Sequence, residues 1–116
     1  MSVTGSCHCG AVSYTLSGDA PAGAMACNCS ICRRKGYLLH FAPADQFTAH
    51  GGDDATTSYR FNQHRIDHLF CKTCGCAPYG TGKGPDGTAM VAINLRCADD
   101  IDLDALTVQR HDGASA

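Results

Sequence analysis

Short stretches in which hydrophobic and polar residues alternate run through much of the chain. Val12, Tyr14 and Leu16 alternate with polar residues, which is the two-residue period of a strand with one buried face. Further alternating or apolar stretches lie at 37–41, 57–61, 66–70 and 89–95. These patterns predict strands, the longest of them at 89–95 and one that ends at Pro43.

Turn-forming residues separate these stretches. Glycine, proline and aspartate gather at 51–54, 78–80 and 82–87, where they predict turns or loops. A single helical turn fits residues 30–35, and no other window has a helical period. Short strands joined by turns predict a mainly β fold. Without a linker, repeat or boundary in the sequence, we expect residues 1–116 to form one domain.

The composition is that of a globular domain with a modest core. The chain has 116 residues, of which 44% are hydrophobic and 17% charged, and it contains no tryptophan. Domains with small cores often gain stability from disulfides or from a structural metal.

Location and partners follow from what the sequence lacks. Residues 1–6 have no basic region and no apolar stretch, so we expect no signal peptide. No run approaches the ~18–20 apolar residues that cross a bilayer. We therefore expect a cytoplasmic protein without a membrane partner, whose thiols stay reduced. The net charge of −2 predicts no nucleic-acid partner, and nothing in the sequence indicates an oligomeric state.

Cysteine is the residue type that points to chemistry. There are nine cysteines, and seven of them form three tight groups at 7–9, 27–32 and 71–74. An odd number argues against a closed disulfide framework. Thiolates one to three residues apart can share one ion, and Zn²⁺ prefers such ligands at distances of roughly 2.3 Å. The groups therefore predict metal binding.

Two of the groups are cysteine pairs that are followed by glycine. Cys71 and Cys74 precede Gly75, as in a zinc knuckle, and Cys7 and Cys9 form a shorter version of the same device. Two such pairs can close one four-sulfur site, which leaves no position for a substrate and is structural. Spacing alone does not require these two pairs to join.

The third group supplies three ligands from one short segment. Cys27, Cys29 and Cys32 would leave the fourth position of a metal free for water or substrate, which is typical of catalytic zinc. In the alternative arrangement Cys76 or Cys97 provides a fourth sulfur and the site is structural. Spacing leaves both arrangements open.

The chain as a whole resembles the glutathione-dependent formaldehyde-activating enzyme family, whose domain also occurs in centromere protein V. The resemblance covers about residues 3–104 and is carried by four segments, at 5–12, 27–32, 68–75 and 91–97. It implies an Mss4-like β-sandwich fold and two zinc ions. The structural zinc would be held by Cys7, Cys9, Cys71 and Cys74, and the second, catalytic zinc by Cys27, Cys29 and Cys32.

The activity that this resemblance implies is that of an S-(hydroxymethyl)glutathione synthase, a carbon–sulfur lyase that acts on a thiol–aldehyde adduct. Its partners would be a small thiol such as glutathione and an aldehyde such as formaldehyde. The chain is shorter than the enzymes for which the family is named, and no glutathione-binding set of residues is recognisable in it. Two other functions fit the cysteines: a non-catalytic zinc-binding interaction module, and a thiol redox or metal-handling protein.

Two further features have a functional and a structural interpretation. Arg33, Arg34 and Lys35 follow the three-cysteine group, either as an anchor for a substrate carboxylate or as a solvated turn, and we favour the turn. His68 either faces the second zinc or has a structural role, and we favour the structural role. Cys76 and Cys97 are expected to be buried and unreactive.

Overall fold

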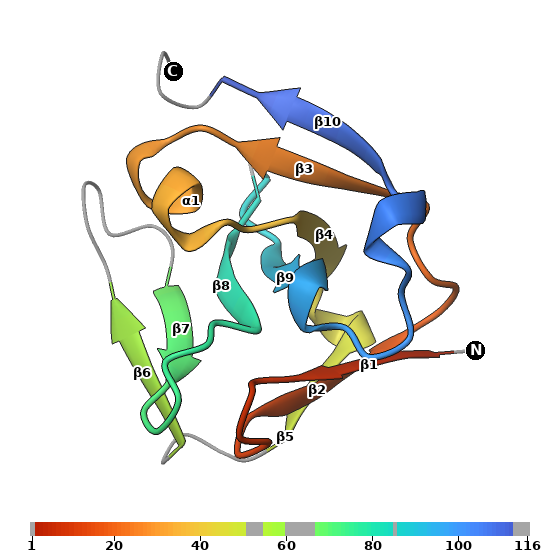
Figure 1. The fold of residues 1–116 in the computed structure, drawn as a ribbon. Helices are drawn as coiled ribbons and strands as arrows, with labels where there is room; N and C mark the ends of the chain where they lie inside the picture. The colour runs from red at the N-terminus through yellow and green to blue at the C-terminus, as the bar shows by residue number, and fades with distance from the viewer. Residues whose placement is uncertain (1, 51–54, 60–66, 85, 113–116) are drawn as a thin grey trace.

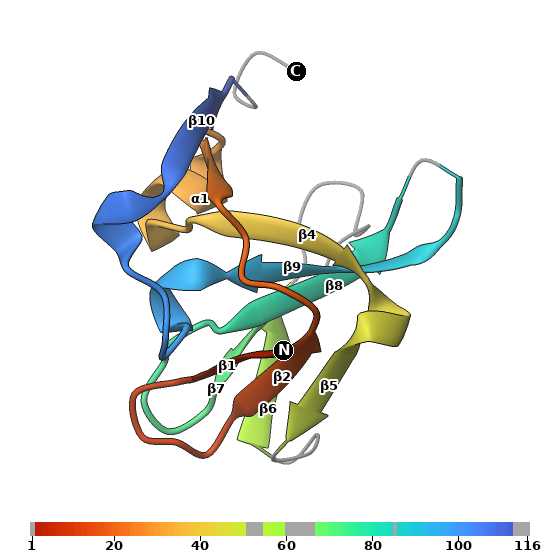
Figure 2. The same cartoon turned by 90° about the vertical axis from the view of Figure 1, so that its right-hand side faces the viewer.

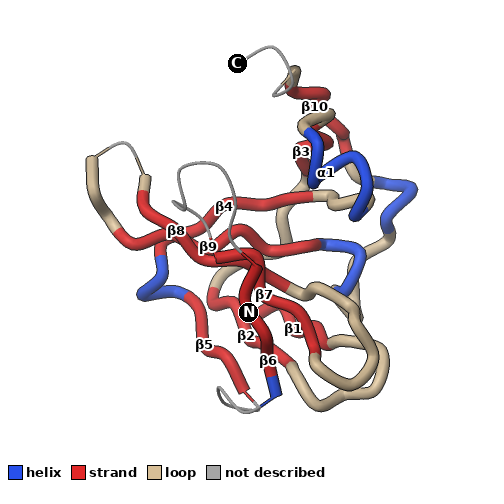
Figure 3. Tube along the Cα trace, turned by 90° about the vertical axis from the view of Figure 1, so that its left-hand side faces the viewer, coloured by secondary structure: helices blue, strands red, loops and turns tan. Residues whose placement is uncertain are grey.

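The computed structural model describes residues 2–50, 55–59, 67–84 and 86–112, and strands dominate this part of the chain (Figures 1 and 3). The strands are β1 (Ser2–Ser6), β2 (Ser13–Ser17), β3 (Gly23–Cys27), β4 (Leu39–Pro43), β5 (Phe47–His50), β6 (Thr56–Tyr59), β7 (Asp67–Cys71), β8 (Tyr79–Lys83), β9 (Ala89–Asn94) and β10 (Thr107–His111). The helix α1 (Ser30–Lys35) and the 3₁₀ turns η1 (Ala44–Gln46), η3 (Leu95–Cys97) and η4 (Leu103–Ala105) lie between them. No helix in these ranges has the length and apolar character that crossing a membrane requires.

The strands form two sheets. The smaller sheet has the order β1-β2-β5 and the larger has the order β10-β3-β4-β9-β8-β7-β6. Neighbouring strands are antiparallel, except that the C-terminal strand β10 runs parallel to β3. In Figure 2 the central strands β4, β9 and β8 of the larger sheet run side by side above the smaller sheet.

The main core lies between the two sheets. Val3, Tyr14 and Leu16 of the smaller sheet are buried together with Val91 and Ile93 of β9. Aromatic rings bridge the layers, because the Phe47 ring lies 5.6 Å from that of Tyr14 and 4.7 Å from that of Tyr79. Burial of these large apolar side chains drives the packing of the sheets. The prediction of a mainly β fold is confirmed.

The other face of the larger sheet carries a second, smaller cluster. Side chains alternate across a strand, so Ala92 faces away from the main core while Val91 and Ile93 face into it. Leu39 of β4 and Met25 of β3 lie on the same outer face, where α1 contributes Ile31 and Cys32. The predicted functional cysteines of residues 27–32 therefore lie on the outer face of the sheet.

Most of the predicted strands are present. The alternating and apolar stretches correspond to β2, β4, β6, β7 and β9, and residues 30–35 form α1. Phe61, Ile66 and the turn at 51–54 lie outside the described residues.

The predicted turn at 78–80 is wrong, because Tyr79 and Gly80 begin β8. Tyr79 pairs with Ile93 and is buried between the sheets, so its packing outweighs the turn preference of its neighbours. The predicted loop at 82–87 is shorter than expected, since Gly82 and Lys83 also belong to β8.

Candidate functional site: two cysteine clusters and a cavity

The structure gathers Cys7, Cys9, Cys71 and Cys74 into one four-sulfur group, in which all sulfurs lie within 4.8 Å of one another. The Cys9 Sγ atom lies 3.7 Å from that of Cys7 and 3.6 Å from that of Cys71. Four sulfurs around a tetrahedral zinc, each at roughly 2.3 Å, would be about 3.8 Å apart. The spacing of this group therefore fits a zinc ion.

Backbone N–H groups point at the sulfurs of this group. Val12 N donates to Cys7 Sγ at 3.4 Å, and Thr73 N donates to Cys71 Sγ at 3.3 Å. The two pairs turn sharply at Gly10 and Gly75, which have φ values of 84° and 79° that other residues rarely adopt. Such N–H donors stabilise thiolates and orient them toward a metal.

Charge repulsion within the four-sulfur group also favours a cation. The N–H of Cys76, with further hydrogen bonds, lowers the pKa of Cys74 to about 5. The N–H of Ala11 acts to lower the pKa of Cys9, but the contact with Cys71, burial and the other sulfurs outweigh it and raise that pKa to about 11. Neighbouring thiols whose pKa values shift in opposite directions cannot all ionise without a positive charge between them.

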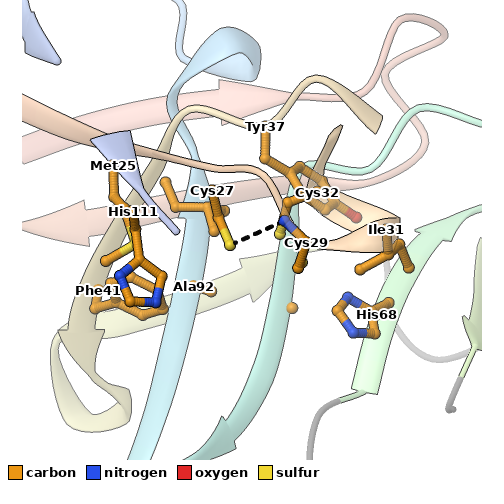
Figure 4. Close-up of a pocket in the computed structure, with 12 residues that line it drawn as sticks. Met25, Cys27, Cys29, Ile31, Cys32, Tyr37, Phe41, His68, Ala92 and His111 are labelled. Carbon is orange, nitrogen blue, oxygen red and sulfur yellow. Dashed lines mark hydrogen bonds between the residues drawn. The ribbon is translucent and has the colours of Figure 1, made fainter. Parts of the chain in front are cut away.

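Cys27, Cys29 and Cys32 form the second, three-sulfur group, again with sulfurs within 4.8 Å of one another. Cys27 ends β3, Cys29 immediately precedes α1, and Cys32 lies one helical turn further on. Arg33 N donates to Cys29 O at 3.0 Å, which closes the first turn, and Cys29 N donates to Cys27 Sγ at 3.4 Å (Figure 4). This local turn brings the three sulfurs together within six residues.

The C-terminal strand holds this segment in place. Cys27 pairs with His111 in the parallel register between β3 and β10. Asn28 N donates to His111 O at 3.1 Å, and Asn28 Nδ2 donates to Asp112 Oδ1 at 3.0 Å. The position of the three-sulfur group therefore depends on residues far away in the sequence.

The sulfurs of the second group differ in environment. Burial raises the pKa of Cys32, which is 9% exposed. Burial acts in the same direction on Cys29, but N–H donors from Cys32 and Ile31 and the neighbouring sulfurs lower its pKa overall. A metal with thiolate ligands fits this group as well. This group would give the metal three sulfur ligands, one fewer than the four-sulfur group.

A cavity of about 280 Å³ opens beside the three-sulfur group. Figure 4 shows the three cysteines with His111 on one side and His68 on the other. The rest of the wall is almost entirely apolar and comes from β3, β4, β9 and the α1 segment: Met25, Ile31, Tyr37, Leu39, Phe41 and Ala92, with Gly80. Burial, aided by the charge of Lys35, lowers the pKa of His68, which favours the neutral ring.

The two remaining cysteines lie near the four-sulfur group and belong to neither cluster among the described residues. Burial raises the pKa of Cys97 to about 11, with a further contribution from the thiolates of Cys76, Cys7 and Cys74. Asn94 Nδ2 contacts Cys97 Sγ at 3.8 Å. A fourth sulfur for the three-sulfur group is therefore not supplied by either residue in this structure.

The basic triplet of α1 is divided between two surfaces. Arg33 lies in a polar groove that borders Cys27 and Cys32, together with Arg96 of η3 and Arg110 of β10. Arg34 and Lys35 lie in a different depression with Tyr59 and Phe70. There Arg34 Nη1 donates to Ser30 O at 2.8 Å, and the Lys35 ammonium lies 4.8 Å from the centre of the Phe70 ring.

Two residues near the site have no signal in the sequence. His111 and Arg110 carry no recognisable spacing relative to the cysteines, and the parallel pairing of β10 with β3 is what brings His111 to Cys27. The sequence does single out His68, and the structure places it in the cavity wall.

Comparison with known proteins identifies the family of the chain. The sequence profile of the glutathione-dependent formaldehyde-activating enzyme family matches residues 2–111. A curated relative from Halomonas elongata, provisionally named a glutathione-dependent formaldehyde-activating enzyme, is 36% identical over an alignment of 89 positions, and the match covers 66% of this chain and 54% of the relative. The chain thus spans about half the length of that relative.

A crystal structure of a Rhodobacter sphaeroides protein has a similar fold. It superimposes with a TM-score of 0.77 at 25% sequence identity and covers 91% of this chain and 99% of the other. The fold, the cysteine clusters and the profile match lead to one conclusion: the chain belongs to the glutathione-dependent formaldehyde-activating enzyme family.

Proposed function

We propose that the protein is a zinc-dependent enzyme of the carbon–sulfur lyase type, which forms or breaks the bond between a thiol sulfur and an aldehyde carbon. Cys27, Cys29 and Cys32 would hold the catalytic zinc, and the four-sulfur group would hold a structural zinc. The observation that carries the proposal is a group of only three sulfurs beside a cavity. The reduced thiols that both groups need are available in the cytoplasm, where we place the protein.

The reaction needs an ionised sulfur, an activated carbonyl and a proton. In the joining direction the sulfur gives an electron pair to the aldehyde carbon, the π electrons of the carbonyl move to oxygen, and oxygen takes up the proton that the thiol has lost. Zinc bound by three cysteines would supply Lewis acidity and would hold a thiol substrate as thiolate near neutral pH.

The residues around the sulfurs would perform the other tasks. The apolar wall formed by Met25, Leu39 and Ala92 would exclude water from the aldehyde. The ring nitrogens of His68 and His111 lie in the same wall and can carry the proton. Holding both reactants in one site removes much of the entropic cost of their addition.

The polar groove supports an acidic thiol such as glutathione, which carries two carboxylates. Arg33, Arg96 and Arg110 line this groove beside Cys27 and Cys32, together with Asp104 and Asp112. The three guanidinium groups outnumber the two carboxylates, so the groove favours an anion. A thiol anchored there would reach the sulfurs at Cys27 and Cys32, which border both the groove and the apolar cavity.

Turnover must be measured against the spontaneous addition of thiols to formaldehyde. Exchange of formaldehyde between its free form and its glutathione adduct can be followed at equilibrium by NMR exchange spectroscopy. We expect the zinc-loaded protein to accelerate this exchange and Cys29→Ser to lose the acceleration while it stays folded with one zinc. Cys76→Ser is the matched control, because Cys76 belongs to neither cluster. Acceleration that persists in Cys29→Ser would refute the assignment.

The thiol side can be tested separately by charge reversal. We expect Arg33→Glu and Arg110→Glu to raise KM for glutathione several-fold and to leave KM for the uncharged thiol 2-mercaptoethanol unchanged. Arg34→Glu is the control, because Arg34 lies in the other depression. Equal effects on both thiols, or an unchanged KM for glutathione, would exclude the arginine groove as the anchor.

The two rival functions predict other results. A non-catalytic zinc-binding module would hold both zinc ions tightly and accelerate no exchange with any thiol. A redox or metal-handling protein would lose zinc readily and oxidise reversibly at its cysteines.

A further inference from the structure

The cavity beside the three-sulfur group is larger and more apolar than formaldehyde requires. Its volume is about 280 Å³, whereas an engineered apolar cavity of about 150 Å³ accommodates benzene. Formaldehyde has one carbon and one oxygen, so it would leave most of this wall in contact with water. Such a wall gains free energy only when an apolar group covers it.

The cavity also lacks partners for a charged molecule. No lysine, arginine, aspartate or glutamate is among its described lining residues, and the polar groups there are the three thiols, His68, His111 and the hydroxyl of Tyr37. A carboxylate buried in it would lose hydration without a lysine or arginine in the wall to offset the loss. The arginines line the polar groove instead, which adjoins the cavity and shares Cys27, Cys32 and His111 with it. The cavity and the groove are therefore suited to different reactants.

The apolar surface continues beyond the cavity. Phe41 and Ala92 also border a second depression over β8 and β9, where Met90 continues the apolar surface and Thr81 and Lys83 lie beside it. Phe41 is 44% exposed, although its ring forms part of the cavity wall. An exposed aromatic ring at the mouth of an apolar cavity is a contact surface for a ligand that extends outward.

We propose that this cavity binds the apolar substituent of an aldehyde larger than formaldehyde, an aliphatic or aromatic aldehyde of about five to eight carbons. The inference rests on the proposed function, since it assigns the aldehyde of the same reaction. The thiol sulfur bonds to the aldehyde carbon, the carbonyl electrons move to oxygen, and oxygen takes the proton of the thiol, which gives a hemithioacetal. The reverse reaction breaks the same carbon–sulfur bond.

An aldehyde series with a fixed thiol measures the preference. With glutathione and zinc-loaded protein, the rate acceleration is kcat/KM divided by the rate constant of the spontaneous addition. This acceleration is expected to rise from formaldehyde through butanal to hexanal. A gain of about fourfold per methylene, equivalent to about 0.8 kcal/mol, corresponds to full burial of each added group. Benzaldehyde is expected to show a larger acceleration over its spontaneous reaction than formaldehyde, for the same reason.

Substitutions in the cavity wall test whether the cavity causes the preference for longer aldehydes. Ala92→Leu fills the cavity and is expected to lower kcat/KM for hexanal at least tenfold relative to that for formaldehyde. Ala49→Leu, at an exposed position of β5 outside the cavity, is the matched control and is expected to change neither value. Met25→Ala enlarges the cavity and shifts the optimum to a longer aldehyde, which provides a test if Ala92→Leu fails to fold.

Binding without reaction gives an independent readout. The chain has three methionines, and Met25 lies in the cavity wall, so its methyl resonance reports a bound ligand. The unreactive 1-hexanol is expected to shift this resonance in a saturable manner, and methanol is expected not to shift it.

The outcomes separate the two proposals. Turnover of formaldehyde without any gain from longer aldehydes, and without a shift of Met25, would overturn the inference and leave the proposed function intact. No turnover with any aldehyde would overturn both, whether or not 1-hexanol binds.

Discussion

A cysteine-to-serine substitution is expected to have different consequences in the two cysteine groups. Cys71→Ser removes one ligand of the four-sulfur group and Cys29→Ser removes one ligand of the three-sulfur group, each with a small change in volume. The four-sulfur group joins distant parts of the chain, since Cys9 and Cys71 are 62 residues apart. Cys27 and Cys32 are separated by only five positions. We therefore expect Cys71→Ser to affect folding and Cys29→Ser to affect the site.

The size of the difference follows from loop closure and burial. The entropy of closing a loop grows with the logarithm of its length, so the ratio of 62 to 5 residues gives the four-sulfur group about 2 kcal/mol more stabilisation. Cys7 and Cys71 are only 2% and 1% exposed, so a lost metal would also leave polar thiols in the core. A domain of this size is stable by about 5–15 kcal/mol, and a structural zinc contributes a comparable amount.

Urea denaturation followed by far-UV circular dichroism, with zinc content per chain, measures both effects. Cys71→Ser is expected to lose its cooperative transition, and Cys29→Ser to unfold cooperatively within about 2 kcal/mol of the parent protein with one zinc retained. A parent-like transition in Cys71→Ser, or an unfolded Cys29→Ser, would refute this division between the groups.

Three further predictions concern stability away from the sulfurs. Asn94→Leu should lower the free energy of unfolding by at least about 2 kcal/mol in urea denaturation, because the buried Asn94 side chain accepts from Leu38 N and donates to Ala77 O, and both would lose a partner. Tyr14→Phe should leave that free energy unchanged or raise it by up to about 1 kcal/mol, since no described residue pairs with the buried Tyr14 hydroxyl. Burial lowers the pKa of His40 below 6.5, so the unfolded chain binds the proton first as pH falls from 7 to about 5. The free energy of unfolding should therefore fall over that pH range, and it should fall less steeply in His40→Gln.

The sequence predicts those strands whose burial alternates regularly. β2 and β9 each bury one face against the main core, which gives the periodic pattern at Val12–Leu16 and at Val91–Ile93. β3 lacks such a signal because its residues are mostly small, and its position depends on pairing with β10 from the far end of the chain. Tyr79 shows the same limit, since a proline and a glycine beside it indicate a turn while its ring is buried between the sheets.

The cysteine spacing predicts metal ligands but not how they combine. Each pair forms a local turn, so its own spacing carries the information, whereas the contact between Cys9 and Cys71 is produced by the fold. In the sequence, only the family resemblance implies that the two pairs join. The cavity wall has no such signature, because Met25, Phe41 and His68 come together only through the order of strands in the larger sheet.

The larger sheet separates the four-sulfur group, which lies on its core side, from the three-sulfur group and the cavity, which lie on its outer face and would select a substrate. Cys7 and Cys71 are part of the core between the sheets, and Cys32 belongs to the cluster on the outer face. The separation extends to adjacent residues of β4: Ala42 is 3% exposed in the main core, while Phe41 is 44% exposed at the mouth of the cavity. Because alternate residues of one strand face different environments, the wall of the cavity can change without repacking the core. We therefore expect substitution of the exposed Phe41 to change which aldehyde reacts while the free energy of unfolding stays nearly constant.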